Sequence, residues 1–170
     1  MLSSADQVTV VNDLVATASS LRKDCVAVTS PNRPAVVNNA GGAVAAVSTA
    51  VANFTKSSYL VVDNNYLKVY DKFNDKFIHI PAASSTAGIM AATDRNFAPF
   101  FSPAGSRRGQ YLGVTALAYN PNKSDRDAHY KSGVNPVANL PGQGILLFGD
   151  KTHQDRPSAF DRINVRRLFL

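Results

Sequence analysis

Two kinds of residue are scarce in this sequence: it contains no glutamate and only one cysteine, Cys25. With a single cysteine the chain cannot form an internal disulfide. It is therefore compatible with a reducing compartment such as a cytoplasm. Cys25 lies in an apolar stretch, which indicates an inert core thiol and not a nucleophile. Because every acidic residue is an aspartate, the carboxylates sit on short side chains, which suit helix caps and turns.

Targeting and membrane signals are also lacking. The N-terminal residues show no basic region followed by an apolar core, so no signal peptide is expected. Residues 34–55 carry no charge and could span a bilayer by length alone. Asn, Ser and Thr side chains interrupt this stretch, which therefore indicates a buried helix that follows a flexible loop. We expect no membrane partner.

Length and composition are those of an ordinary globular protein. The sequence has 170 residues, of which 45% are hydrophobic and 18% are charged. These values predict one folded α/β domain, residues 1–170, with its own core. The net charge of +6 is unevenly placed, because residues 1–94 hold seven basic and seven acidic residues, and residues 95–170 hold eleven and five. A basic second half indicates an acidic partner surface, either nucleic acid or protein.

Helical and extended patterns alternate along most of the sequence. Helices are predicted from a capping box of Ser4 and Gln7, from residue 44, after Ser84 or Ser85, and from a cap of Ser124 and Asp127. Strands are predicted at 24–29, 59–62, 112–119 and 145–148, with a hairpin at 66–70 and 76–80 and loops at 31–42 and 95–111. The predicted fold class is α/β: a mixed, partly parallel sheet covered by helices, with a β-hairpin and a long irregular loop.

The closing segment, residues 140–170, predicts a Pro/Gly loop, a buried strand, a polar loop and a helix capped by Ser158 and Asp161. This helix has no single polar face, since apolar side chains fall on two sides of it. It therefore predicts burial on both sides, with arginines leaving between the contacts. Either a second copy covers the second side, or the chain is cut from a longer protein.

No pattern assigns a catalytic, cofactor-binding or metal-binding residue. Residues 144–152, GILLFGDKT, approach the phosphate-loop pattern, but the apolar interior and Asp150 favour a strand that leaves the core. His79, His129 and His153 have no second ligand at metal-binding spacing. We expect neither a cofactor nor a metal.

Two charged groups are candidate subunit-interface sites. The first consists of Asp125, Arg126, Asp127 and Lys131. It forms either a solvated helix surface, with ion pairs of about 0.3–0.5 kcal/mol each, or an intersubunit contact that sets register. The second consists of Asp161, Arg162, Arg166 and Arg167. Three arginines in an apolar frame make a poor nucleic-acid helix, so contacts with carboxylates of neighbouring subunits are favoured.

Several sequence blocks resemble one protein family and occur in the same order. They are SPAGSRRGQ (102–110), LAYNP (117–121), SDRDAHYKSGVNPV (124–137), PGQGILLFGDKT (141–152) and FDRINVRRLF (160–169). Together they resemble the sheath protein of contractile bacteriophage tails, closest to the T4-like myophages. Residues 1–98 match in layout more than in motif.

The resemblance implies a structural protein and not an enzyme. It implies hexameric rings stacked helically around a tail tube protein, with baseplate and tail terminator proteins as further partners. Such a sheath belongs to the virion, is assembled in the host cytoplasm, and contracts to drive the tube into the host. The family continues past the FDRINVRR helix into more sheet and a C-terminal arm, which we do not recognise here, so residues 1–170 are expected to be a partial core.

Two other functions stay open from the residue types. A basic α/β module could bind nucleic acid, with an affinity that falls steeply with salt, although the resemblance makes nucleic acid an unfavoured partner. A small α/β enzyme could build a site from loops at strand ends, with residues 95–111 as one wall.

Overall fold

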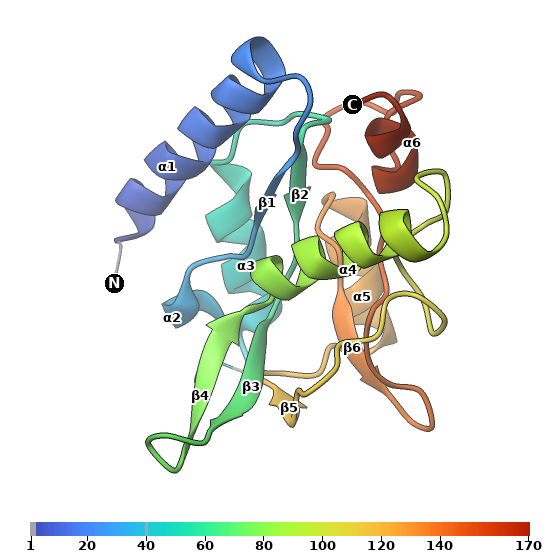
Figure 1. The fold of residues 1–170 in the computed structure, drawn as a ribbon. Helices are drawn as coiled ribbons and strands as arrows, with labels where there is room; N and C mark the ends of the chain where they lie inside the picture. The colour runs from blue at the N-terminus through green and yellow to red at the C-terminus, as the bar shows by residue number, and fades with distance from the viewer. Residues whose placement is uncertain (1–2, 40) are drawn as a thin grey trace.

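The computed structural model describes residues 3–39 and 41–170. In chain order the elements are α1 (Ser4–Ala16), the π-helical turn η1 (Thr17–Leu21), β1 (Ala27–Thr29), α2 (Arg33–Val36), α3 (Ala43–Ala52), β2 (Leu60–Val62), β3 (Tyr66–Asp71), β4 (Lys76–Pro81), α4 (Ala82–Asn96), β5 (Ala116–Leu117), α5 (Lys123–Lys131), β6 (Val137–Leu140), β7 (Gly144–Leu147) and α6 (Ile163–Leu168). Helices surround short strands (Figure 1), so the predicted mixed α/β class is confirmed.

The short strand β2 lies between two layers of helices. It pairs in parallel with β1. Because side chains alternate along a strand, Leu60 and Val62 point to one side and join the core formed with α1 and α3. Val61 points to the other side and packs with Met90 of α4 and Ile163 of α6. Each of these buried side chains contributes about 1.5–3 kcal/mol of stability, so β2 holds both layers together.

The strands form three small sheets in place of one. The hairpin β3–β4 is antiparallel, with Tyr66 opposite Pro81 and Asp71 opposite Lys76, and β5 pairs with the other edge of β3. β6 and β7 form the third sheet. The sequence predicted the hairpin and β7 but not β6, because Asn139 interrupts the apolar residues of β6, whereas β7 has a continuous apolar run.

Three consecutive polar residues, Asp63, Asn64 and Asn65, are fully buried where these sheets meet. Asn64 accepts a hydrogen bond from the Val137 backbone N–H (2.8 Å) and donates one to the Tyr119 hydroxyl (2.8 Å). Asn65 donates to the Tyr119 carbonyl oxygen (2.7 Å). Since a buried polar group without a partner costs about 1–3 kcal/mol, these bonds fix β2, β3 and β6 relative to one another.

Helix α1 begins one residue before the predicted start. Its N-cap is Ser3, whose hydroxyl accepts from the Asp6 N–H (3.2 Å), and the Asp6 carboxylate accepts from the Ser3 N–H (3.3 Å). The predicted pair of Ser4 and Gln7 is wrong, because a carboxylate is the stronger acceptor and suits the positive end of the helix. Gln7 donates instead to the Ser30 carbonyl oxygen (2.8 Å).

Helix α5 also begins before the predicted start. Asn122 is its N-cap and accepts from the Asp125 N–H (2.9 Å), while the Asp125 carboxylate accepts from the Asn122 N–H (3.1 Å). This closed capping box replaces the predicted pair of Ser124 and Asp127, which has the same spacing. Spacing alone therefore did not distinguish the two caps.

Two further boundaries in the middle of the chain differ from prediction. Helix α4 starts at Ala82 and not at Ser84 or Ser85, because Pro81, with φ −63°, leads the chain directly from β4 into the helix. The predicted strand 112–119 is reduced to β5, because Gly113 adopts φ +73°, a left-handed conformation that interrupts extended backbone.

The closing segment contains less helix than predicted. Ser158 is not a helix cap: its hydroxyl accepts from the Phe160 N–H (3.1 Å) in a turn and donates to the Gln154 side chain (2.6 Å). Helix α6 begins only at Ile163, with Arg162 at the N-cap position and no side-chain capping bond. Tertiary contacts therefore hold the residues before α6.

Cys25 is exposed, which corrects the prediction of a core thiol. The predicted strand 24–29 pairs only from Ala27, because β2 offers three partner residues. The predicted loop 31–42 contains α2, and its residue Ala40 lies outside the described residues. Within residues 3–39 and 41–170, no helix combines the length and the apolar character needed to cross a bilayer.

Candidate intersubunit surface

A groove beside α5 brings together residues from both predicted interface groups. It has a volume of about 460 Å³. Its lining, called here the α5 groove, consists of Ala104, Gly105, Arg126, Asp127, Tyr130, Phe148, Asp150 and Arg162. Arg126 and Asp127 come from α5, and Arg162 comes from the residues just before α6. The fold therefore places three of the eight predicted interface residues in one surface depression.

Asp150 organises the polar end of the α5 groove. Its carboxylate accepts hydrogen bonds from the Ser102 hydroxyl (3.0 Å) and from the Tyr130 hydroxyl (3.3 Å). It also forms an ion pair with Arg162, which contacts the Tyr130 hydroxyl as well. Because half of the Arg162 side chain is exposed to solvent, this pair contributes about 1 kcal/mol at most. Arg162 is thus oriented by the fold but open to a partner.

The apolar end of the groove is formed by Phe148, which is exposed, beneath the guanidinium of Arg126. The Arg126 Cζ lies 5.1 Å from the centre of the Phe148 ring, and Arg126 donates to the Pro121 carbonyl oxygen (3.1 Å). Such a cation–π contact is worth about 0.5–1 kcal/mol at an exposed site. The groove therefore presents an aromatic surface with charges of both signs at its edges.

The other residues of the first charged group have separate positions. Asp125 is occupied as the capping partner of Asn122. Asp127 and Lys131 are exposed, and neither forms an ion pair within the described residues. Local ion pairs therefore do not account for these charges on α5.

Arg166 and Arg167 are buried in the chain's own fold, which corrects the prediction that the arginines leave between apolar contacts. The Arg166 Cζ lies between two rings, 4.3 Å from that of Tyr59 and 3.9 Å from that of Phe160. Arg167 forms an ion pair with Asp94 at the end of α4. Its Nε and Nη1 atoms are buried without a hydrogen-bond partner.

Apolar side chains and not arginines are exposed at the end of α6. Leu168, Phe169 and Leu170 are all more than 40% exposed. Asp161 contributes through its backbone, since its carbonyl oxygen accepts from the Thr152 N–H (2.9 Å). Arg166 and Arg167 therefore fix α6 from inside the fold, whereas the last three hydrophobic residues, 168–170, are exposed.

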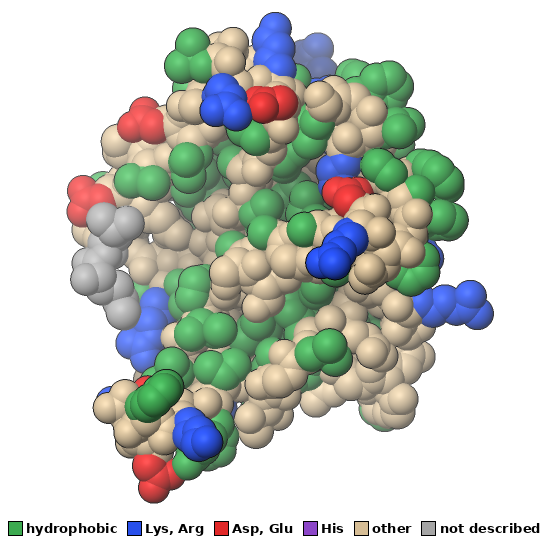
Figure 2. Space-filling view, in the orientation of Figure 1, with side chains coloured by type: hydrophobic (Ala, Val, Ile, Leu, Met, Phe, Trp, Pro, Cys, Tyr) green, Lys and Arg blue, Asp and Glu red, His purple; other side chains and the backbone are tan. Residues whose placement is uncertain are grey.

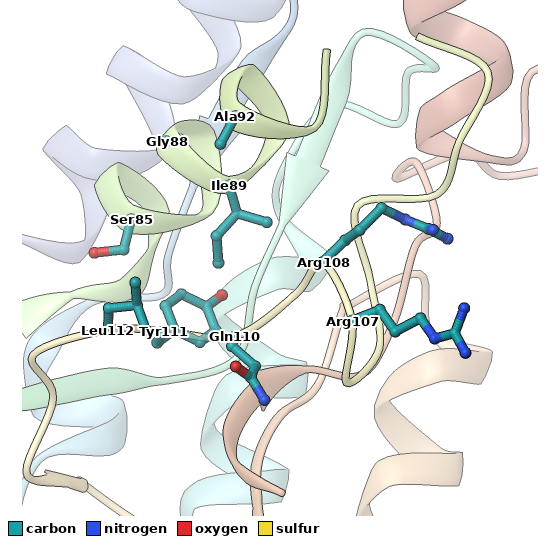
Figure 3. A pocket seen from close by; sticks show the side chains of 9 residues that line it. All are labelled: Ser85, Gly88, Ile89, Ala92, Arg107, Arg108, Gln110, Tyr111 and Leu112. Carbon is teal, nitrogen blue, oxygen red and sulfur yellow. The ribbon is translucent and has the colours of Figure 1, made fainter. Parts of the chain in front are cut away.

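A second depression, called here the α4 groove, has part of the predicted irregular loop, residues 95–111, in its lining. It has a volume of about 360 Å³. Ser85, Gly88, Ile89 and Ala92 of α4 line one side, and Arg107, Arg108, Gln110, Tyr111 and Leu112 line the other. Figure 3 shows Ile89, Tyr111 and Leu112 facing the space below α4, with both arginines at one end of it. Its two sides come from segments with no shared motif, so the sequence did not predict that α4 forms the opposite wall.

Arg108 is held at the end of the α4 groove. Its guanidinium lies over the rings of Phe97 (5.7 Å) and Phe101 (5.0 Å), and its Nε donates to the Ser102 carbonyl oxygen (2.7 Å). Arg107 is exposed. The groove therefore has one fixed and one exposed guanidinium.

A buried carboxyl group lies behind the α4 groove. Asp63 accepts hydrogen bonds from the hydroxyls of Ser30 (2.6 Å) and Thr86 (3.0 Å), and Thr86 also lies 2.8 Å from the Tyr111 hydroxyl. Complete burial raises the pKa of Asp63 to about 7, although both hydrogen bonds act in the opposite direction. Asp63 has no exposed surface, so its role is in packing and stability.

The three histidines are spread over the fold. His79 is half-buried in β4, and burial lowers its pKa. His129 is fully buried, with Nε2 2.9 Å from the Tyr119 hydroxyl. His153 is also fully buried, between the Gly133 carbonyl oxygen (3.1 Å) and the Lys56 amine (2.9 Å), and burial lowers its pKa to about 4. In the described part of the chain, no three His, Cys, Asp or Glu side chains group to hold a metal ion.

Comparison with protein families gives the decisive observation. Residues 2–153 match the family described as phage tail sheath protein central domain. The chain belongs to the phage tail sheath protein family. The family predicted from the sequence blocks is thus confirmed, and it is a family of structural proteins of bacteriophage tails.

Tail sheath proteins of two other phages are similar to this chain over nearly its whole length. The tail sheath protein of Vibrio phage KVP40 is 43% identical over 175 aligned positions, which cover 95% of this chain and 26% of that protein. The tail sheath protein of Enterobacteria phage T4 is 40% identical, covering 98% of this chain and 27% of that protein. This sheath chain therefore spans about a quarter of the length of these relatives.

Solved structures with the same fold come from contractile injection systems. The chain superposes on a protein in the baseplate of the anti-feeding prophage with a TM-score of 0.73 and 17% identity, covering 98% of this chain and 40% of that one. A chain of the contracted PVC sheath complex gives a TM-score of 0.62 and 21% identity, covering 74% and 34%. These likenesses show that the chain shares its fold with these proteins.

In this sheath chain, the blocks that carry the family resemblance lie side by side. Residues 105–111 run along β7: the Gly105 N–H donates to the Leu147 carbonyl oxygen (2.9 Å), and the Tyr111 N–H donates to that of Ile145 (2.9 Å). A Cβ at Gly109 would meet the Gly105 backbone nitrogen at 2.8 Å. Close backbone approach therefore explains a glycine in this block.

Proposed function

We propose that the protein is a structural subunit of a contractile phage tail sheath. Copies of the subunit form hexameric rings that stack helically around a tail tube, and contraction of the sheath drives the tube into the host. The observation that carries this proposal is the family match over residues 2–153. Identities of 40–43% to tail sheath proteins over nearly the whole chain support it.

The proposed partners are further copies of the subunit, the tail tube protein, and the baseplate and tail terminator proteins. The proposed location is the virion, after assembly in the host cytoplasm. Support comes from structural relatives, which belong to an anti-feeding prophage baseplate and to its contracted helical sheath.

Contraction requires subunits that move as nearly rigid bodies between two lattices, with contacts that differ between the two states. The buried hydrogen bonds of Asn64 and Asn65 and the helix layers on both sides of β2 support a stiff body. We propose that residues 1–170 behave as one such α/β unit. No ligand or hydrolysis step is needed, because the assembled lattice supplies the free energy.

We propose that the two charged groups act in different ways at the subunit interface. Arg126, Asp127, Lys131 and Arg162 are the side chains that contact a neighbour, since they are at least partly open to solvent. Arg166 and Arg167 hold α6 in the position that such a contact requires, since both are buried. Asp125 and Asp161 fix the backbone on either side of the α5 groove.

Electron microscopy of the full-length protein that carries this chain tests the function. The purified protein is concentrated alone and with tail tubes of the same phage. We expect tubes or rings whose end-on averages show six-fold symmetry. Particles without cyclic or helical order under both conditions would contradict the proposal.

A further inference from the structure

The β3–β4 hairpin extends away from the body of the protein and ends in a fully exposed aromatic ring. Figure 1 shows the hairpin projecting past every neighbouring element, and Figure 2 shows hydrophobic side chains gathered on it. Phe73, at its tip, is 98% exposed, the highest value for a large hydrophobic side chain among the described residues. Tyr70 and Phe77 of the same hairpin are also about half exposed, and such a group of exposed rings indicates a contact with another molecule.

Two carboxylates are fixed on either side of this ring. Asp71 accepts hydrogen bonds from the Phe73 backbone N–H (3.0 Å) and from the Asn74 side chain (2.6 Å). The same bonds, led by that of Asn74, lower the pKa of Asp71. Asp75 accepts a hydrogen bond from the Tyr70 hydroxyl. The tip, residues 71–75, thus presents one ring between two held carboxylates, with Lys72 beside the ring and Lys76 opposite Asp71.

The α4 groove has the complementary character. Its apolar part contains Ile89 and Leu112, and Leu112 is 87% exposed, second only to Phe73 among the large hydrophobic side chains described. Its charged part contains Arg107 and Arg108, and no carboxylate lines it. Figure 3 shows that both guanidiniums lie at one end of the groove, beside the apolar space and not inside it.

We infer that the hairpin tip of one copy inserts Phe73 into the α4 groove of a second copy, with Asp71 and Asp75 facing Arg107 and Arg108. The contact rests on the proposed sheath function, because it gives the subunits of that lattice one of their interfaces. It pairs the two most exposed hydrophobic side chains, Phe73 and Leu112, and brings two carboxylates to a groove that has two guanidiniums and no carboxylate.

In a ring or helical lattice the contact is made head-to-tail and not by reciprocal exchange of two tips. None of the residues that line the α4 groove belongs to the hairpin, so the tip and the groove are separate surfaces of one chain. When a tip occupies the groove of a neighbour, each pair still has one free tip and one free groove. Such heterologous contacts generate rings or open helices and not closed two-fold dimers.

Two variants block the two halves of the contact separately. Phe73→Ser removes the ring from the tip, and Gly88→Phe fills the groove from α4. Both should fold, because Phe73 contacts solvent and a Cβ at Gly88 meets no atom within 4 Å. Leu21→Ser is the matched control, since it removes a 77% exposed apolar side chain at the end of η1, away from both surfaces. Circular dichroism checks that each variant folds.

Sedimentation velocity of the full chain at rising concentration measures the association. We expect wild type and Leu21→Ser to form a concentration-dependent series of species, and each blocking variant alone to associate at least tenfold more weakly. An equimolar mixture of Phe73→Ser and Gly88→Phe should form dimers and nothing larger, because one variant supplies the tip and the other the groove. Monomeric wild type, unaffected blocking variants, or a mixture without dimers would each overturn the inference.

Failure of this contact and failure of the sheath function give different results. If the full-length protein builds six-fold tubes or rings and both blocking variants build them equally well, the hairpin contact is wrong and the sheath function stands. If the mixture forms dimers but the wild type never builds cyclic or helical particles, the contact stands and the sheath function is wrong.

Discussion

The Lys56 amine lies 2.9 Å from Nε2 of His153, a residue 97 positions further along the chain. The other ring nitrogen, Nδ1, lies 3.1 Å from the Gly133 carbonyl oxygen. A neutral imidazole satisfies both contacts, with Nδ1–H donating to Gly133 and Nε2 accepting from the ammonium group. A proton on Nε2 would place two positive charges in contact inside the protein.

This arrangement predicts that His153 weakens the fold in acid. Its pKa is about 4 in the folded protein, whereas an unfolded histidine titrates near 6.5. Between these values the unfolded state binds a proton that the folded state does not, so the free energy of unfolding falls as pH decreases from 6.5 to 4. The destabilisation caused by His153→Gln, measured by urea unfolding, should therefore be about 2 kcal/mol smaller at pH 5 than at pH 7. An equal effect at both pH values would contradict this assignment.

Asp63 acts with the opposite sign. Its pKa of about 7 in the fold exceeds the value near 3.9 of an unfolded aspartate. The folded state therefore holds the extra proton, and the stability contributed by this group decreases as pH rises from 4 to 7. Asp63→Asn should gain stability relative to wild type across that window, by about 1.4 kcal/mol per pH unit at most, and keep a constant difference above pH 7. Unfolding curves of both proteins between pH 4 and 8 measure the slope.

The ion pair between the buried Arg167 and the partly exposed Asp94 predicts an asymmetry between its two partners. Asp94→Ala leaves the guanidinium buried without its one ionic partner, and should cost about 1–3 kcal/mol. Arg167→Met removes the buried charge and keeps much of the side-chain volume, so it should cost less. Chemical denaturation of the two variants and of the double variant tests the order. A larger loss for Arg167→Met would show that the guanidinium stabilises α6 through contacts other than the ion pair.

Two glycines should respond to alanine in opposite directions. Gly109→Ala places a Cβ 2.8 Å from the Gly105 backbone nitrogen and should destabilise the protein by about 1–3 kcal/mol. Gly88→Ala adds a methyl group in open space within α4 and should stabilise it by about 0.5–1 kcal/mol. Thermal unfolding of both variants provides the comparison, with Gly88→Ala as the control for substitution itself.

Local sequence patterns were sufficient to predict the elements that depend only on their own residues. The hairpin was predictable because polar residues separate two short extended runs, and β7 was predictable because Ile145, Leu146 and Leu147 form one apolar run. Cap choice failed where two candidates had equal spacing. Ser3 and Asn122 are preferred for the bonds they close, which spacing does not reveal.

Long-range contacts determined the features that the sequence could not supply. Arg166 and Arg167 are buried because Tyr59 and Asp94, which are far away in sequence, supply a ring and a carboxylate. The α4 groove exists because residues 107–112 pass below α4 on their way along β7. Neither arrangement has a local sequence pattern, so neither could be predicted without the three-dimensional structure.

The three buried residues from Asp63 to Asn65 form the whole connection between β2 and β3. A force on the projecting hairpin therefore acts directly on β2, the strand that packs against both helix layers. In the proposed sheath, a neighbour that pulls on the hairpin therefore moves the whole subunit and does not bend a hinge within it. Little mechanical work is then lost to deformation of the subunit.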